Sequence, residues 1–278
     1  MKLLMGLLLL ILFDRAGQAQ FYYKDVIVTR QTTDRWKLYK ANKVRSVRLS
    51  SFESDGQPSE GFEGDQEVSG DFSLIDTHTK SSRSPDSRLM AWYSPDGHPT
   101  RSEDTSDTYR SVSEYRYDPS GRLMAITNTS IETDNKVQAE EEHLWLYDAD
   151  GKPSSMLKIS NGTDTTFVRF VRDEKGNVAE EHATRNSTEL PAVYYYYDAD
   201  NRLTDIVRYN SRAQKLLPDY IFEYDAGGKL ASMLMVPEQN NSEYQKWIYE
   251  YNDKGLKMKE SCFNKRRELM GMVEYAYK

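Results

Sequence analysis

The chain has 278 residues, a formal net charge of −7 and a mean hydropathy of −0.79. A negative net charge disfavours nucleic acid and anionic membrane surfaces as partners, because both are themselves negative. Cys262 is the single cysteine, so an intrachain disulfide is excluded.

The first residues predict a secretory signal peptide over residues 1–19. A lysine precedes an apolar run at residues 3–13, and Gly17 and Ala19 supply the small side chains expected before a cleavage site. An uncleaved anchor is the alternative, because charged residues follow the apolar run directly. We expect an exported bacterial protein, periplasmic or secreted, because animal extracellular domains usually carry disulfides. No membrane insertion is expected after the signal is removed.

Residues 20–88 predict an N-terminal β segment. Residues 26–28, 36–39 and 44–49 are rich in β-branched and aromatic side chains, which favour strands. Glycines and acidic residues at 54–70 predict an irregular loop. The segment lacks clear repeats, so we interpret it as a candidate cap that shields the end of a repeat array.

A four-residue turn recurs through the rest of the chain, with Asp or Asn first and Gly or Asn last. The first side chain can accept a hydrogen bond from the backbone two residues on, and the fourth residue tolerates positive φ. The first and fourth residues of the six copies are Asp118 and Gly121, Asp148 and Gly151, Asp173 and Gly176, Asp198 and Asn201, Asp225 and Gly228, and Asn252 and Gly255. Looser copies lie at 53–56 and 94–97. Each copy predicts a tight β-hairpin turn.

The segments around these turns alternate between aromatic and polar residues. Tyr115 and Tyr117 lie two apart, as do Tyr249 and Tyr251, so each pair shares one face of a strand. We therefore predict an all-β fold, an antiparallel meander of β-hairpins over residues 89–278 that forms one continuous domain with the N-terminal segment. Uniform turns should lie at one rim and variable loops at the other.

One exception to the strands is predicted. Residues 134–143 are compatible with a short helix, although no segment has a convincing helical period.

The run from Tyr115 to Leu123 reads Tyr-x-Tyr-Asp-x-x-Gly-Arg-Leu and resembles the YD repeat of the RHS/YD-repeat family. Residues 197–203 and 224–230 resemble it nearly as well, and the likeness extends over residues 89–278. The resemblance implies a curved or spiralling β-sheet and a bacterial cell-surface or secreted protein. It also implies one alternative function, a truncated delivery module of an RHS-type toxin system.

The sequence predicts no catalytic residue, no cofactor and no metal site. The four histidines are scattered, and nucleophile-elbow, phosphate-loop and His-Glu-x-x-His motifs are missing. A calcium loop starting at Asp148 or Asp198 would need Glu at its twelfth position, where Ile159 and Tyr209 stand. We therefore expect a protein that is not an enzyme. A carboxylate-based glycan hydrolase is the alternative, because two acids in a cleft suffice for that reaction.

The 20 tyrosines, 9 phenylalanines and 4 tryptophans offer a ligand surface. Most should pack the inner face of the sheet, while alternation leaves some rings outside it. The candidate ligand-facing aromatics are Tyr194, Tyr195, Tyr196, Trp92, Trp145 and Trp247. The leading hypothesis is a non-catalytic envelope scaffold or binding module whose partner is a glycan or another envelope protein.

Overall fold

The computed structural model describes residues 21–82, 84–132, 138–236 and 244–278. One helix, α1 (Lys24–Ala41), precedes nineteen strands that pair antiparallel in a single sheet. The strands are β1 (Ser46–Glu53), β2 (Glu63–Val68), β3 (Leu74–Ser81), β4 (Ser84–Tyr93), β5 (Pro99–Ser106), β6 (Tyr109–Tyr117), β7 (Leu123–Glu132), β8 (Gln138–Tyr147), β9 (Pro153–Ser160), β10 (Asp164–Arg172), β11 (Val178–Arg185), β12 (Thr188–Glu189), β13 (Val193–Tyr197), β14 (Leu203–Asn210), β15 (Lys215–Tyr224), β16 (Leu230–Met235), β17 (Gln245–Tyr251), β18 (Lys257–Phe263) and β19 (Leu269–Tyr277). The all-β antiparallel meander is therefore confirmed for this part of the chain.

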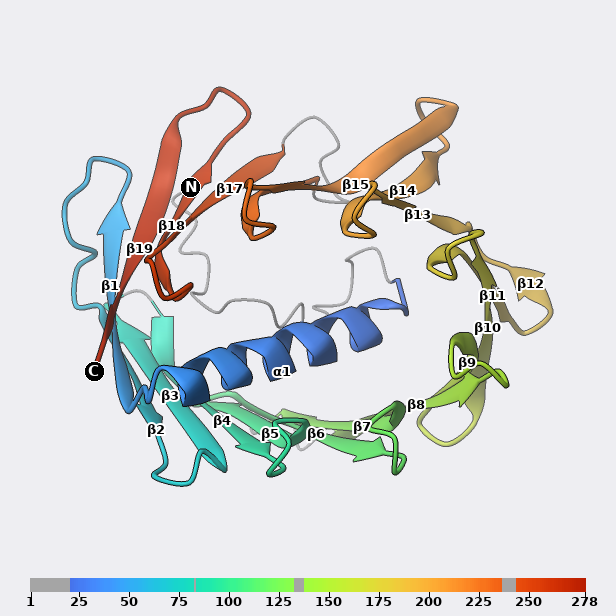
Figure 1. The fold of residues 1–278 in the computed structure, drawn as a ribbon, viewed down its shortest axis with the longest axis horizontal. Coiled ribbons are helices and arrows are strands. Elements are labelled where there is room, and N and C mark those ends of the chain that lie inside the picture. The colour runs from blue at the N-terminus through green and yellow to red at the C-terminus, as the bar shows by residue number, and fades with distance from the viewer. Residues whose placement is uncertain (1–20, 83, 133–137, 237–243) are drawn as a thin grey trace.

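The sheet closes into a ring, which corrects the expectation of a curved or spiralling sheet. β1 pairs with β2 on one side and with β19 on the other, from Val47 opposite Tyr277 to Glu53 opposite Gly271. β11 pairs with both β12 and β13, so β12 is a side branch and the ring contains the other 18 strands. Figure 1 shows this ring from one end. Closure pairs the first and last strands, which would otherwise be free edges.

The repeated turns have the geometry that their residues favour. At all six, the fourth residue has a φ between 60° and 84°, and its N–H donates to the carbonyl of the first residue at 2.9–3.2 Å. The first side chain also accepts the N–H of the fifth residue at 2.8–3.0 Å. A further turn of this kind runs from Asn264 to Arg267, whose φ is 62°. Sequence reasoning missed it because arginine stands where glycine was expected.

The N-terminal segment contains a helix where strands were predicted, so that prediction is wrong for residues 26–28 and 36–39. β-branched residues there have low helix propensity, which favoured the strand interpretation. Tertiary burial overrides this preference, because Thr29, Thr33 and Trp36 are buried at helical spacing. Figure 1 shows α1 inside the ring, along the side formed by β3 to β7.

Three other sequence predictions, a helix, a loop and a signal peptide, have different outcomes. The predicted helix at 134–143 is wrong for residues 138–143, which begin β8, and its other residues lie outside the described part. The predicted loop at 54–70 contains β2, so the irregular stretch is shorter than expected. The predicted signal peptide lies outside the described residues. Among those that are described, no helix is long and apolar enough to cross a membrane.

The two faces of the ring differ in chemistry. The inner face carries the buried apolar and aromatic side chains that surround α1. On the outer face, ion pairs link strands of the sheet. Arg101 of β5 pairs with Glu114 of the adjacent β6 at 2.8 Å, and Arg116 of β6 reaches across β7 to Glu142 of β8 at 3.0 Å. The Arg116 side chain is 67% exposed. The inner face is thus mainly apolar with buried polar contacts, and the outer face combines ion pairs with exposed apolar side chains such as Leu146 and Phe167.

Candidate functional site: a cavity beside the internal helix

Five tyrosines at the ends of strands have a structural role on the inner face, and four of them directly precede a repeated turn. The hydroxyl of each donates to the backbone carbonyl of the residue that begins an earlier strand. The pairs are Tyr147 with Leu123 (2.7 Å), Tyr197 with Val178 (2.9 Å), Tyr224 with Leu203 (2.8 Å), Tyr251 with Leu230 (2.9 Å) and Tyr277 with Lys257 (2.6 Å). Tyr117 also precedes a turn, but its buried hydroxyl has no hydrogen-bond partner in the described part of the chain. The cation that follows a turn lies over the next such ring, as Arg202 does over Tyr224 at 4.9 Å. These contacts tie consecutive hairpins together and align the rings.

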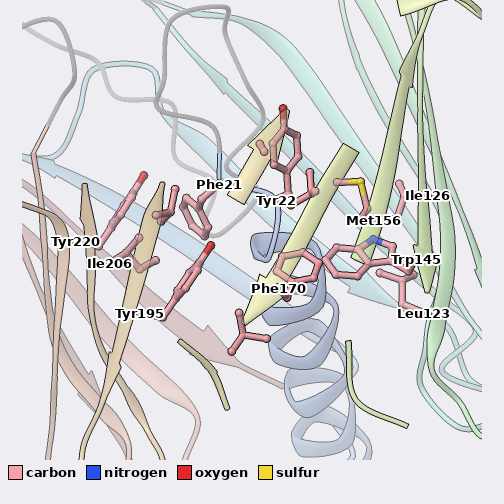
Figure 2. Close-up of a cluster of buried hydrophobic side chains, with 14 residues drawn as sticks. Phe21, Tyr22, Leu123, Ile126, Trp145, Met156, Phe170, Tyr195, Ile206 and Tyr220 are labelled. Atoms are coloured by element: carbon pink, nitrogen blue, oxygen red, sulfur yellow. The ribbon is translucent and has the colours of Figure 1, made fainter. Parts of the chain in front are cut away.

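A buried carboxylate holds the start of α1. One oxygen of Glu181 accepts the backbone N–H groups of Tyr22 and Tyr23, both at 2.9 Å, and the hydroxyl of Tyr195 at 2.7 Å. These N–H groups would lack partners within the helix, and a negative charge near a helix N-terminus is favourable. Burial raises the pKa of Glu181. Figure 2 shows Phe21, Tyr22 and Tyr195 in this part of the core, with Trp145 stacked against Phe170.

A second buried network fixes the first turn of α1 to the wall. Asp25 lies 2.6 Å from Nδ1 of His143, whose Nε2 lies 2.8 Å from Glu141, and Glu141 pairs with Lys158 at 2.5 Å. Burial alone would lower the pKa of His143, but the two carboxylates outweigh it and raise the pKa to about 9. Burial would raise the pKa of Glu141, but its two cationic partners lower it to about 2. Both ring nitrogens of His143 are thus occupied, and the network anchors α1 to the wall.

The other end of α1 packs against the turn rim. Nε1 of Trp36 donates to the carbonyl of Phe72 at 2.7 Å, and the indole stacks on Tyr93. Gly97 approaches this ring so closely that a Cβ there would lie 2.2 Å from it. Tyr39, one turn on, donates its hydroxyl to Gln66 at 2.9 Å. Both ends of the helix are therefore attached to the ring.

Between α1 and the facing wall lies a cavity of about 710 Å³. Its apolar lining comes from the helix and from strands on either side of it. These residues include Tyr23, which directly precedes α1, with Val26, Ile27 and Leu38 of α1, and Tyr197, Leu203, Phe222, Tyr224, Leu230, Tyr251 and Tyr275 of the wall. Exposed residues Arg30, Asn201 and Gly228 also line it, so the cavity reaches the surface at the turn rim.

The charged lining of the cavity is mostly cationic. Five cations, Arg30, Arg35, Arg202, Lys229 and Lys257, face a single carboxylate, Asp34, among the described lining residues. Two further polar atoms there, Nε of Arg35 and Oε1 of Gln31, are buried without a hydrogen-bond partner in the described part of the chain. The site therefore combines an aromatic and aliphatic wall with unsatisfied polar groups.

The six aromatic residues singled out from the sequence lie elsewhere. Tyr195 and Trp145 are buried in the core at 3% and 1% exposure. Strand register places Trp247 on the inner face, opposite Cys262. Tyr194, Tyr196 and Trp92 alternate with inward residues and so lie on the outer face, where Arg101 lies over Trp92 at 5.7 Å. None of the six lines the cavity.

Sequence reasoning missed the cavity because one side of its wall is α1, which was interpreted as strands. The spacing of Asp25, Thr29, Thr33 and Trp36 was the available signal, but it is largely polar. The repeat tyrosines of the wall were recognised as inward-facing. In the described ranges, no group of three or more His, Cys, Asp or Glu side chains is placed to hold a metal ion.

No family model matches the chain, and no curated protein matches it. Among solved structures, it is similar to a porin-like protein from Bacteroides uniformis at 10% identity, over 84% of this chain and 96% of that chain, with a TM-score of 0.44. A porin-like protein from Bacteroides vulgatus matches at 11% identity over 84% and 98%, with a TM-score of 0.28.

The Photorhabdus luminescens Tc holotoxin pore matches at 11% identity over 78% of this chain, with a TM-score of 0.32. The chain spans about 15% of the length of that toxin chain. All these TM-scores lie below 0.5, so no argument about this chain rests on them.

Proposed function

We propose that this chain is an exported, non-catalytic binding protein that holds an apolar organic ligand in the cavity beside α1. The cavity itself carries the proposal. Its volume of about 710 Å³ falls within the range of about 300–1,000 Å³ that is usual for small-molecule sites. Aromatic and aliphatic side chains form most of its wall, and a few polar groups converge on it, as such sites require.

The outer face supports a location in water, in the periplasm or outside the cell. A membrane-spanning β-barrel presents an apolar band to lipid, and charges on that face are destabilising. Here the outer face carries ion pairs between strands, such as Arg88 with Asp76 and Lys246 with Glu223, alongside exposed apolar side chains such as Leu146 and Phe167. We propose export because the sequence predicts a signal peptide. We propose a bacterial origin because this export signal is combined with a single cysteine, which cannot form an intrachain disulfide.

A glycan hydrolase is less well supported by this cavity. Glycoside hydrolysis uses two carboxyl groups about 5–10 Å apart across the scissile bond. Asp34 is the one carboxylate among the described lining residues, and its exposed side chain lies 3.9 Å from Lys37. The lining of the cavity therefore supports ligand binding better than it supports glycoside hydrolysis.

A neutral fluorescent probe, N-phenyl-1-naphthylamine, tests the proposal directly. We expect saturable binding with a stoichiometry of one. Leu203→Trp should weaken it about tenfold or more by filling the cavity, a loss of about 1.4 kcal/mol. Leu146→Trp makes the same change on the outer face, at a side chain that is 54% exposed, and should leave the affinity unchanged. Absent saturation, or equal losses in the two variants, would contradict the proposal.

Glycan binding on the outer face is a second candidate. Tyr196 is 48% exposed and Tyr209, on the neighbouring strand, is 53% exposed, so two rings are open to solvent on that wall. Aromatic side chains offer a large flat apolar surface with a polar tip. A glycan array with the wild type and Tyr196→Ala tests it: signals that persist in the variant would rule out this surface.

The interpretation as a toxin-delivery module rests on the YD-repeat resemblance alone. Its test is an adjacent toxin or immunity gene.

A further inference from the structure

The helix presents a guanidinium to the cavity without an opposing acid. Arg35 lies on α1 and lines the cavity, and its Nε is buried without a hydrogen-bond partner. Arginine stays protonated in proteins, so this charge cannot be relieved by losing a proton. Burying an ion without an opposite charge costs free energy. The neighbouring Tyr93 favours the charged form of Arg35 but supplies no carboxylate, so an anion that reaches the guanidinium is favoured.

The acids of the interior are already engaged elsewhere. Glu181 and Glu141 hold the N-terminal end of α1, and Glu260 pairs with Lys257 and accepts the hydroxyl of Tyr275. Asp34, the next residue to Arg35, is 64% exposed and lies near Lys37 at 3.9 Å. No ion pair joins Arg35 to a carboxylate in the described stretches.

Other groups of the lining reinforce the positive character. Arg30 and Lys229 line the cavity and form no ion pair with a described carboxylate, whereas Arg202 pairs with Asp198 at 2.7 Å. Gln31 lies one turn before Arg35, and its buried Oε1 lacks a donor. Rotating this amide by 180° would present its NH₂ to an anion instead. Thus the cavity is cationic although the whole chain has a net charge of −7.

We propose that the ligand is an amphipathic organic anion, with its acid group bound at Arg35 and its apolar chain against Leu203, Phe222 and Leu230. The inference rests on the proposed function and adds the chemical class of the ligand. A guanidinium binds a carboxylate through two parallel hydrogen bonds, which orients the head group. The aliphatic and aromatic wall then excludes water from the rest of the molecule.

Competition between matched ligands tests this. Dodecanoate and dodecanol share a chain and differ in charge, and each displaces N-phenyl-1-naphthylamine from the purified protein at neutral pH. We expect dodecanoate to bind about 10- to 100-fold more tightly, the usual value of a charge-assisted hydrogen bond. Arg35→Met should remove that preference by lowering the dodecanoate affinity far more than the dodecanol affinity, and Arg35→Lys should retain part of it. Arg116→Met, on the outer face, is the control.

The outcomes separate the two proposals. If both ligands bind equally to the wild type, or if Arg35→Met weakens both equally, the anion proposal is wrong while the binding function stands. If neither ligand displaces the probe, the anion proposal is wrong, and saturable binding of the probe itself decides whether the binding function stands.

Discussion

Replacing Gly97 by alanine tests whether α1 lies against the turn rim inside the ring. Gly97 has a φ of 86°, and an added Cβ would lie 2.2 Å from Cε3 and 2.7 Å from Cζ3 of Trp36. Gly176 is a matched control, since its φ is 84° and the nearest atom to its Cβ would be a flexible Lys152 carbon at 3.9 Å. Both variants introduce the same backbone strain, but only the new Cβ at position 97 clashes with a side chain of α1.

The expected difference follows from this geometry. Left-handed backbone costs a residue with a Cβ about 1–2 kcal/mol, which should be the whole effect at Gly176. At Gly97 the indole must also move from a site where Trp36 is 4% exposed and bonded to the Phe72 carbonyl. Overpacking and a strained hydrogen bond add about 2–4 kcal/mol. We therefore expect a total loss of about 3–6 kcal/mol for Gly97→Ala.

Urea unfolding, followed by tryptophan fluorescence and far-ultraviolet circular dichroism, measures both losses. Coincident transitions and equal m-values are needed to compare them as free energies. Trp36→Leu combined with Gly97→Ala should cost less than the sum of the single changes, because the smaller side chain removes the clash. Equal losses in Gly97→Ala and Gly176→Ala, with no such coupling, would refute the position of α1.

Three other predictions follow from the interior. The His143 pKa is raised from 6.5 to about 9, so its stabilisation should be full below pH 6.5 and lost as pH rises through 9. The Glu141 pKa is lowered from 4.5 to about 2, so its contribution should be lost as pH falls through that range. Urea midpoints against pH, with His143→Phe flattening the alkaline limb, check this.

Burial raises the pKa of Cys262 to about 12, so a thiol reagent should label it only in denaturant; labelling of the native protein would contradict this. Tyr197→Phe should cost about 1 kcal/mol, the value of its hydroxyl bond to a strand carbonyl. Tyr194→Phe, on the outer face, should cost almost nothing by the same urea measurement, and equal costs would count against the inward hydroxyl bonds.

The turns show how far local chemistry extends. The six Asp/Asn-to-Gly/Asn copies reverse the chain where their residues predicted, because φ at Gly121 or Asn201 and the side-chain acceptor at Asp118 are properties of a few adjacent residues. The same reasoning missed Asn264 to Arg267, where neighbouring strands hold a residue with a Cβ at positive φ. Local preference is thus sufficient but not necessary for these turns.

The helix shows where local chemistry fails. Val26, Ile27 and Val28 favour a strand in isolation, yet they lie in α1. The groups that stabilise the helix are far away in sequence: Glu181 holds its first N–H groups, and His143 binds Asp25 across 118 residues. No window of sequence contains both partners of these contacts.

The amino-acid sequence by itself determined the antiparallel hairpins, the position of their turns and the inward face of the tyrosines, because each depends on residues within a few positions. Only the tertiary structure decided that β1 closes the ring against β19, that a helix occupies its interior, and that Arg35 reaches a cavity between them. Ring closure and burial depend on surfaces from distant parts of the chain. These surfaces stabilise the fold only after they have come into contact, so no local sequence pattern reports them.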